Sequence, residues 1–156
     1  MSELSHINEK GEASMVDVSA KPIVLREAVA AGSISLASNT IGLIQGDGIA
    51  KGDVLATARL AGIMAAKKTG EMIPLCHPLP LDNAEVSFEI PDSNDRINIT
   101  ASAKTAARTG VEMEALTAVS IAALTVYDMC KAVDKAMVIG EIGLVSKTKK
   151  TLEADG

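Results

Sequence analysis

The segments Ala84-Glu-Val-Ser-Phe-Glu-Ile90, Pro91-Asp-Ser-Asn-Asp95 and Ile97-Asn-Ile-Thr-Ala-Ser102 follow one another in the middle of the chain. In the first and third segments apolar residues alternate with polar ones, which is typical of strands that bury one face. The segment between them has the length of a hairpin loop and carries Pro and Asn. The sequence therefore predicts a central antiparallel hairpin with one solvated face.

Two further strands and two helices are predicted around this hairpin. Upstream, residues 33–37 alternate as a strand, and residues 51–69 carry an apolar stripe of helical spacing that Gly70 is expected to end. Downstream, residues 111–135 form a long helix and residues 138–145 a final strand. This order predicts an α+β, ferredoxin-like (βαββαβ) fold, an antiparallel sheet with two helices on one face. The opposite face then needs covering, which favours oligomerisation.

The composition bounds the class of protein. At 156 residues the chain fits one domain, and its apolar residues are mostly small aliphatics, with one Tyr, one Phe and no Trp. Such a core buries little area per side chain, so we expect a homo-oligomer. A net charge of −5 argues against nucleic acid or a membrane surface as the main partner.

Three regions and one compartment are expected. Residues 1–20 form an extended N-terminal arm, in which 15–19 is compatible with a short strand. Residues 21–147 form the ferredoxin-like catalytic domain, and 148–156 a flexible C-terminal tail. With two cysteines, no secretory leader and no apolar run expected to span a membrane, the protein is predicted to be cytoplasmic with free thiols.

The loop Ile73-Pro-Leu-Cys-His-Pro-Leu79 predicts a binding site, because its prolines stiffen the backbone that presents His77. A thiol hydrolase using Cys76 and His77 is one alternative, but adjacent residues of an extended loop point in opposite directions. A metal site from Cys76, His77, Cys130 and His6 is a weaker one, since the spacing matches no known pattern.

The long helix carries polar residues at both ends. Thr109 and Glu112 have the spacing of a capping box, a purely structural alternative for this acidic start. Asp128 and Lys131 are three residues apart in an otherwise apolar helix. We therefore expect a buried pair whose pKa values shift toward neutrality for catalysis; the alternative is an exposed pair of little consequence.

Distance constrains how the two ends can cooperate. Glu114 and Asp128 share one face of the helix but lie fourteen residues apart, about 20 Å along its axis. One small substrate cannot reach both. If both ends take part in the reaction, the site must combine two subunits.

Basic residues predict an anion site. Lys51 opens a helix after the turn Gly46-Asp-Gly48, where free amides favour an anion. Together with Arg26 and His77 it is suited to a phosphorylated metabolite. The alternative is that Lys51 is solvated surface.

Seven blocks of this sequence, in order, resemble the cyclic pyranopterin monophosphate synthase family (molybdenum cofactor biosynthesis protein C family). The resemblance runs from about residue 4 to residue 147. The blocks are His6-Ile-Asn, Gly11-Glu-Ala, Met15-Val-Asp-Val-Ser19, Lys51-Gly-Asp-Val54, Ile73-Pro-Leu-Cys-His-Pro78, Thr109-Gly-Val-Glu-Met-Glu-Ala-Leu-Thr117 and Tyr127-Asp-Met-Cys-Lys-Ala132.

The resemblance implies a lyase in a hexamer, a trimer of dimers with sites at subunit interfaces. Its substrate is a triphosphate nucleotide, 3′,8-cyclised dihydro-GTP, which becomes cyclic pyranopterin monophosphate with release of pyrophosphate. By motif position, the implied catalytic residues are Asp128, Lys131 and Lys51. The implied substrate-binding residues are Leu75, Cys76, His77, Met113, Glu114, Glu112, Arg26 and Lys147.

No cofactor or metal ligand is expected, and Mg²⁺ accompanying the triphosphate remains an open alternative. A non-catalytic oligomeric domain that binds a phosphometabolite is the alternative function. The sequence departs from the family pattern at two places: Arg108 replaces a common Lys, and Ser146-Lys-Thr-Lys-Lys-Thr151 replaces a Gly-rich run. The second departure bears on the role of Lys147.

Overall fold

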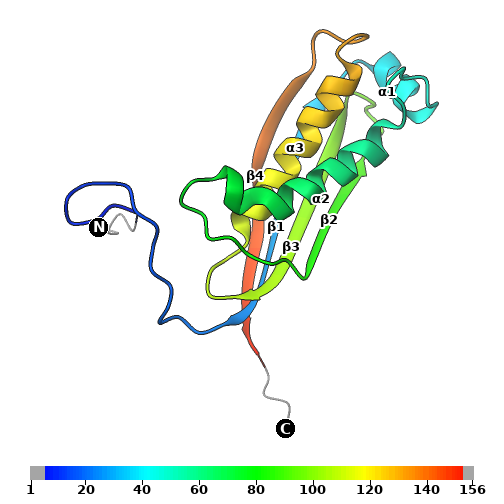
Figure 1. Cartoon of the computed structure of the whole chain (residues 1–156). Coiled ribbons are helices and arrows are strands. Elements are labelled where there is room, and N and C mark those ends of the chain that lie inside the picture. Colours follow the sequence, from blue (N-terminus) through cyan, green and yellow to red (C-terminus); the bar gives the residue numbers. More distant parts are fainter. Residues whose placement is uncertain (1–5, 153–156) are drawn as a thin grey trace.

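The computed structural model describes residues 6–152 and has the predicted ferredoxin-like fold. Four antiparallel strands lie in the order β2-β3-β1-β4, so each helical crossover joins strands that are not neighbours (Figure 1). The elements are β1 (Val24–Ser35), α1 (Ser38–Gln45), α2 (Val54–Met72), β2 (Asn83–Glu89), β3 (Arg96–Ala107), α3 (Glu112–Cys130) and β4 (Val138–Thr151).

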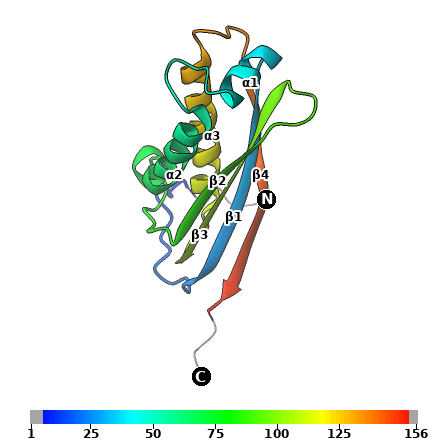
Figure 2. The ribbon, with the colours of Figure 1, turned by 90° about the vertical axis from the view of Figure 1, so that its right-hand side faces the viewer.

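Helices α2 and α3 cover one face of the sheet and leave the other without a layer (Figure 2). Along β1, Ala28, Ala30 and Ile34 are buried under the helices, while Val29 and Ser33 between them are only half-buried. Successive side chains of a strand point to opposite faces. The second face of β1 is therefore incompletely covered in the single subunit.

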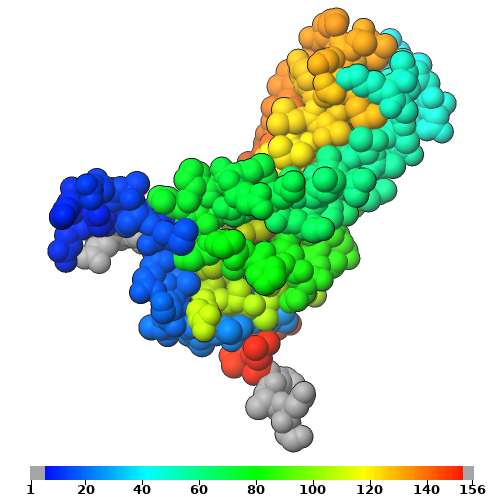
Figure 3. Space-filling model, in the orientation of Figure 1, coloured from blue at the N-terminus to red at the C-terminus, as the bar shows by residue number. Residues whose placement is uncertain are grey.

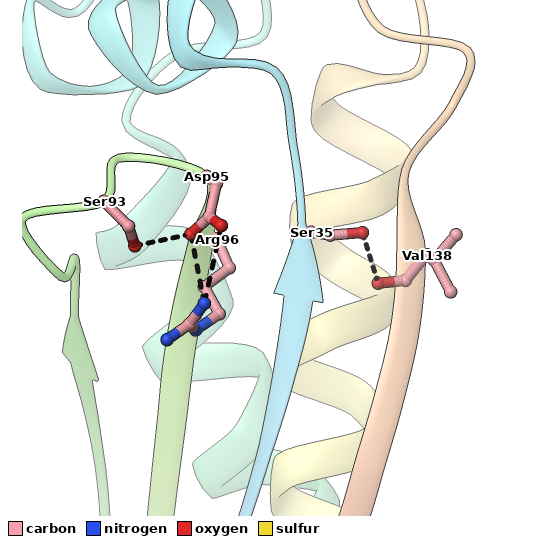
Figure 4. Close-up of polar contacts among 5 residues, drawn as sticks. All are labelled: Ser35, Ser93, Asp95, Arg96 and Val138. Atoms are coloured by element: carbon pink, nitrogen blue, oxygen red, sulfur yellow. Dashed lines mark hydrogen bonds and ion pairs between the residues drawn. The ribbon is translucent and has the colours of Figure 1, made fainter.

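The predicted hairpin is confirmed as β2 and β3. Val86 pairs with Ala101 and Phe88 with Ile99 on the helix-facing side. In the loop, Asp95 accepts hydrogen bonds from Ser93 Oγ at 2.7 Å and from Arg96 Nη1 at 3.2 Å (Figure 4). These contacts hold the turn in a defined shape beside the end of β1.

Small residues let the two long helices approach closely. A Cβ added at Gly62 of α2 would lie 2.9 Å from the carbonyl oxygen of Ala118 in α3 and 2.9 Å from Val86 Cγ2. Ala115, Ala118, Ala122 and Ala123 make up much of the buried face of α3. The Ala-rich composition thus allows close helix packing in place of bulky side chains.

Helix α1 and the first half of β1 are not predicted by the sequence. The strand begins at Val24, because pairing with β3 and β4 on both sides satisfies its backbone before the alternating pattern starts. The N-cap residue of α1 is Ala37, whose side chain cannot cap the helix. Instead Asp134, far along the chain, accepts hydrogen bonds from Ala37 N and Thr40 Oγ1, both at 2.9 Å.

The bounds of α2 differ from the prediction at both ends. Asp53 is the N-cap and accepts from Ala56 N at 3.0 Å, so the helix begins after Lys51 and not at it. Gly70 does not end the helix, which continues to Met72. Its role is a close approach described with the site below.

The capping box that the spacing of Thr109 and Glu112 offered as an alternative does not form at the start of α3. The N-cap is Val111, without a side-chain cap from the described residues, and Glu112 instead accepts a hydrogen bond from Lys147 Nζ at 3.1 Å. The helix ends at Cys130 and not at residue 135. The segment after it turns away, and Asp134 there binds the start of α1.

Strand β4 is longer than expected and runs through Thr151. Residues 148–151, expected in the tail, pair with β1, and Thr and Lys there can extend a ladder that a Gly-rich run would weaken. In the arm, residues 15–19 form no strand, and an isolated bridge joins Ile7 to Ala13.

Helix α3 is long and apolar enough to cross a membrane by length and composition, contrary to the expectation from sequence. However, it packs along the sheet, and half of its apolar window is buried there. Burial in the core accounts for its apolar composition.

Candidate functional site

Most of the predicted site residues lie around the N-terminal end of α3. A cavity of about 300 Å³, here called the His77 pocket, lies between the arm, the loop after α2 and the start of α3. The predicted residues that line it are Leu75, Cys76, His77, Glu112, Met113 and Glu114. The structure therefore brings together two motifs that are about 35 residues apart in the chain.

The loop after α2 is held at two points, by close packing at Pro78 and by a hydrogen bond at Asp82. A Cβ at Gly70 would lie 2.8 Å from Pro78 Cα, so only glycine lets the loop cross α2 this closely. At the far end, Asp82 accepts from Ala106 N at 3.2 Å. His77 is thus presented from a firmly placed backbone.

The arm forms one wall of the His77 pocket. His77 Nε2 lies 2.7 Å from the carbonyl oxygen of Val16, a hydrogen bond in which the imidazole donates. The arm (blue) meets the surface of the segment after α2 in the space-filling view (Figure 3). Val16, Val18 and Lys21 line the pocket, although sequence analysis assigned none of them to a site. Their polar, aperiodic surroundings gave no signal of burial.

Two carboxyl groups give the His77 pocket its electrostatic character. Burial, reinforced by the nearby Glu112, raises the pKa of Glu114, which is almost completely buried. For Glu112 burial also acts to raise the pKa, but its backbone hydrogen bond and Lys147 outweigh it, so the pKa is lowered. Glu112 is therefore ionised at neutral pH, and Glu114 holds a proton more readily than an exposed carboxyl group.

The same environment argues against a cysteine nucleophile. Burial, followed by the negative charges of Glu114 and Glu112, raises the pKa of the Cys76 thiol. The thiol, not the thiolate, is then the form at neutral pH. Cys130 is fully buried in α3 and its thiol pKa is also raised, by burial and by Asp134.

Arg26 and Lys147 lie in a neighbouring cavity of about 230 Å³, here called the Arg26 pocket. Gly110 and Glu112 line both cavities, so the two adjoin at the start of α3. Arg26 Nη2 donates to the backbone carbonyl of Arg108 at 3.4 Å. The charged head of Arg108 is not needed for this contact, because the carbonyl is common to Lys and Arg.

The remaining predicted residues gather at the C-terminal end of α3, here called the Asp128 cluster. Asp128 Oδ1 lies 2.8 Å from Lys131 Nζ, and Oδ2 lies 2.9 Å from Lys51 Nζ. Lys51 also donates to the Asp128 backbone carbonyl at 3.0 Å. The loop before α2 thus places Lys51 against the last turn of α3.

The expected burial of the Asp128–Lys131 pair is wrong for the single subunit. The two side chains are 57% and 56% exposed. The hydrogen bonds from Lys131 and Lys51 lower the pKa of Asp128 to about 2, and Asp128 raises the pKa of Lys131. Both shifts are away from neutrality, because each partner stabilises the charged form of the other. The cluster is a carboxylate that holds two ammonium groups.

The two ends remain far apart within one subunit, as the helix length requires. Glu114 belongs to the first turn of α3 and Asp128 to its last, about 20 Å away along the axis. Within residues 6–152 no group of three or more His, Cys, Asp or Glu side chains is arranged to hold a metal ion.

Comparison with known proteins identifies the family. Residues 15–150 match the MoaC family. Similar proteins include "Cyclic pyranopterin monophosphate synthase 3" of Mycobacterium bovis, 58% identical over 93% of this chain and 81% of the relative. The "Cyclic pyranopterin monophosphate synthase" of Thermoanaerobacter sp. is 58% identical over 93% of this chain and 92% of the relative. That of Thermomicrobium roseum is 56% identical over 94% and 89%, respectively. The chain therefore belongs to the MoaC family.

Proposed function

We propose that this protein is a cyclic pyranopterin monophosphate synthase, a lyase of molybdenum cofactor biosynthesis. Relatives that bear this name are 55–58% identical over 93–95% of the chain. The observation that carries the proposal is structural. Predicted site residues scattered between positions 26 and 147 gather at the two ends of α3.

The proposed reaction rearranges 3′,8-cyclised dihydro-GTP and releases pyrophosphate. In its last step a hydroxyl oxygen of the substrate attacks the α-phosphorus, and the bond from that phosphorus to the β-phosphate oxygen breaks. The hydroxyl proton must leave, and negative charge accumulates on the departing pyrophosphate. Such a step needs a proton acceptor and fixed positive charge.

The pocket at the start of α3 is suited to holding the substrate. His77 can donate a hydrogen bond, as it does to Val16 O, and Arg26 and Lys147 supply positive charge beside it. Burial raises the pKa of Glu114, and its carboxyl group can bond to a polar ring atom, as an acceptor when ionised and as a donor when protonated. In this proposal His77, Glu114 and their neighbours orient the ring system while Arg26 and Lys147 face phosphate.

The Asp128 cluster of the single subunit is suited to electrostatic stabilisation. Asp128 contacts the ammonium groups of both Lys131 and Lys51 and fixes their positions. With a pKa of about 2, Asp128 is a weak base in the empty single subunit. We propose that Lys131 stabilises developing charge, and that substrate displaces a lysine from Asp128. Loss of the ion pair then removes the cause of both pKa shifts, so that Asp128 accepts protons and Lys131 donates them.

A complete site is proposed to form between subunits of a hexamer, a trimer of dimers. Large apolar side chains stay exposed on the single subunit, including Leu60 on α2, Leu124 on α3 and Val145 on β4. Burying such surface is what drives association. Assembly would bring the Asp128 cluster of one subunit to the His77 pocket of another. The free cysteines fit a cytoplasmic enzyme.

Product formation from the purified cyclised nucleotide tests the proposal. The unmodified protein is expected to release pyrophosphate and cyclic pyranopterin monophosphate in equal amounts. Lys131→Ala and Asp128→Asn are each expected to reduce kcat by about two orders of magnitude or more, the usual contribution of a proton-transfer group. Lys135→Ala is the matched control, an exposed lysine four residues beyond Lys131.

Two outcomes would count against this function. Near-normal turnover in both Lys131→Ala and Asp128→Asn would remove the Asp128 cluster from the reaction. Tight nucleotide binding without any product would favour the non-catalytic phosphometabolite-binding domain. Titrating EDTA and Mg²⁺ in the same assay decides whether the triphosphate reacts as its magnesium complex.

A further inference from the structure

Lys149 lies in β4 directly opposite Arg26 of β1. Opposite residues of an antiparallel pair project to the same face, with Cβ atoms about 5 Å apart. Lys147, two positions earlier, lies on that face as well, since strand residues alternate. The longer β4 therefore brings a third cation beside Arg26 and Lys147.

This arrangement is unfavourable without a ligand. Like charges directly opposite each other in a sheet are destabilising. Glu112 partners Lys147, and Glu27, the other carboxylate lining the Arg26 pocket, lies 3.9 Å from Lys104 Nζ. Among the described residues no carboxylate lies within salt-bridge distance of Lys149.

Arg26 supplies a second, independent indication of a missing partner. Its Nε atom is inaccessible to solvent and has no hydrogen-bond acceptor within residues 6–152. Buried donors in native proteins are almost always satisfied. An acceptor-rich anion in the Arg26 pocket would relieve the repulsion between Arg26 and Lys149, and a rotation of the Arg26 side chain toward the cavity would let it satisfy this donor.

The size and position of the cavity suit a polyphosphate. Its volume of about 230 Å³ exceeds what a single ion requires, and it adjoins the His77 pocket through Gly110 and Glu112. The start of α3 also lies here, where the helix dipole favours negative charge. A nucleotide in the His77 pocket can thus extend its phosphates toward Lys149.

We propose that Lys149 is an additional anion-binding residue, which contacts the β- and γ-phosphates of the substrate alongside Arg26 and Lys147. The inference rests on the proposed function for the identity of the nucleotide. Lys149 belongs to the segment that departs from the Gly-rich family pattern. In this chain β4 presents Lys147 and Lys149 on the face that lies toward the phosphates.

Pyrophosphate binding to the intact protein tests the assignment without turnover. The variants are Lys149→Gln, Lys149→Arg and, as matched control, Lys150→Gln. Lys150 has the same charge and strand but pairs with Leu25, so it projects to the opposite face. Calorimetry gives the pyrophosphate Kd, and thermal unfolding without ligand gives Tm.

Lys149→Gln is expected to weaken pyrophosphate binding roughly three- to tenfold, because one solvated charge contact is lost. In the turnover assay it is expected to raise the KM of the nucleotide and to leave kcat unchanged. It is also expected to raise Tm without ligand, because the repulsion with Arg26 is removed. A residue with a merely structural role would lower Tm. Lys149→Arg should bind as the unmodified protein does, and Lys150→Gln should change Kd less than twofold.

The assignment is overturned if pyrophosphate does not bind the unmodified protein, or if Lys149→Gln and Lys150→Gln weaken binding equally. Equal weakening would mean that overall charge, not the Arg26 pocket, attracts the anion. Lys149-dependent binding without product formation would support the assignment and refute only the proposed function. Product formation together with pyrophosphate binding that does not depend on Lys149 would support the proposed function and refute the assignment of Lys149.

Discussion

Mixing two inactive variants tests whether the active site is shared between subunits. His77→Ala removes the imidazole from the pocket at the start of α3, and Lys131→Ala removes an ammonium group from the cluster at its end. About 20 Å of helix separates these two ends within one chain. Each variant alone therefore lacks one half of every site, whether sites are shared or not.

The expected recovery follows from counting subunit combinations. If every site takes the start of α3 from one chain and the end from another, random assembly of equal amounts leaves about one quarter of the sites with both halves intact. Activity should therefore return to about 25% of the unmodified level. Mixing at one to three should give about 19%, the product of the two fractions.

The assay combines co-expression with differently tagged chains, sequential affinity purification and pyrophosphate release. Purifying a portion through both tags shows that mixed oligomers have formed, and activity is measured before this selection, to which the expected percentages apply. A mixture that contains both chains yet has only the residual activity of the separate variants would refute the shared site. In that case both ends would have to belong to one subunit, and a different geometry would be needed.

Three further perturbations probe the elements that hold the site. Asp134→Ala removes the acceptor of three hydrogen bonds and is expected to lower the free energy of unfolding by about 2–4 kcal/mol in urea titrations. Those bonds lower the pKa of Asp134, so their contribution to stability is present above the unfolded pKa of about 3.9 and is lost as pH falls through the lower folded pKa. The difference in unfolding free energy between Asp134→Ala and the unmodified protein should therefore shrink in acid. A difference that stays constant with pH would contradict this cause. Gly70→Ala is expected to displace the loop at Pro78, with a loss of about 1–3 kcal/mol and weaker nucleotide binding. The control Gly42→Ala, which meets open space in a helix, should gain up to about 1 kcal/mol. Cys76→Ser is expected to keep kcat within a few-fold, since the raised thiol pKa excludes a reactive thiolate, and complete inactivity would restore the thiol hydrolase.

The fold could be predicted from sequence where the pattern is local. The alternation around Val86 and Ile99 and the helical spacing of the two long helices identified β2, β3, α2 and α3. The predicted bounds of helices and strands were wrong where contacts with residues distant in sequence decide them. Helix α1 depends on Asp134, and Glu112 binds Lys147 instead of capping its own helix.

Part of the candidate site could be predicted in the same way. The spacing of Glu114 and Asp128 already separated the two ends of α3, and the structure keeps them apart. The state of the Asp128 cluster was not predictable. The apolar composition of α3 suggested burial of its last turn, but that turn lies at the edge of the helical layer, where both side chains reach solvent.

The sequence by itself determined the family, the succession of the long helices and the strands along the chain, and the residue types available for chemistry, because periodicity and motif spacing are properties of the chain. Only the tertiary structure decided which residues meet. It placed Val16 against His77, Lys51 against Asp128 and Lys149 opposite Arg26. The physical reason is that hydrogen bonds, ion pairs and burial depend on distances between segments remote in sequence, and these distances are set by how the helices pack on the sheet and by the register of its strands.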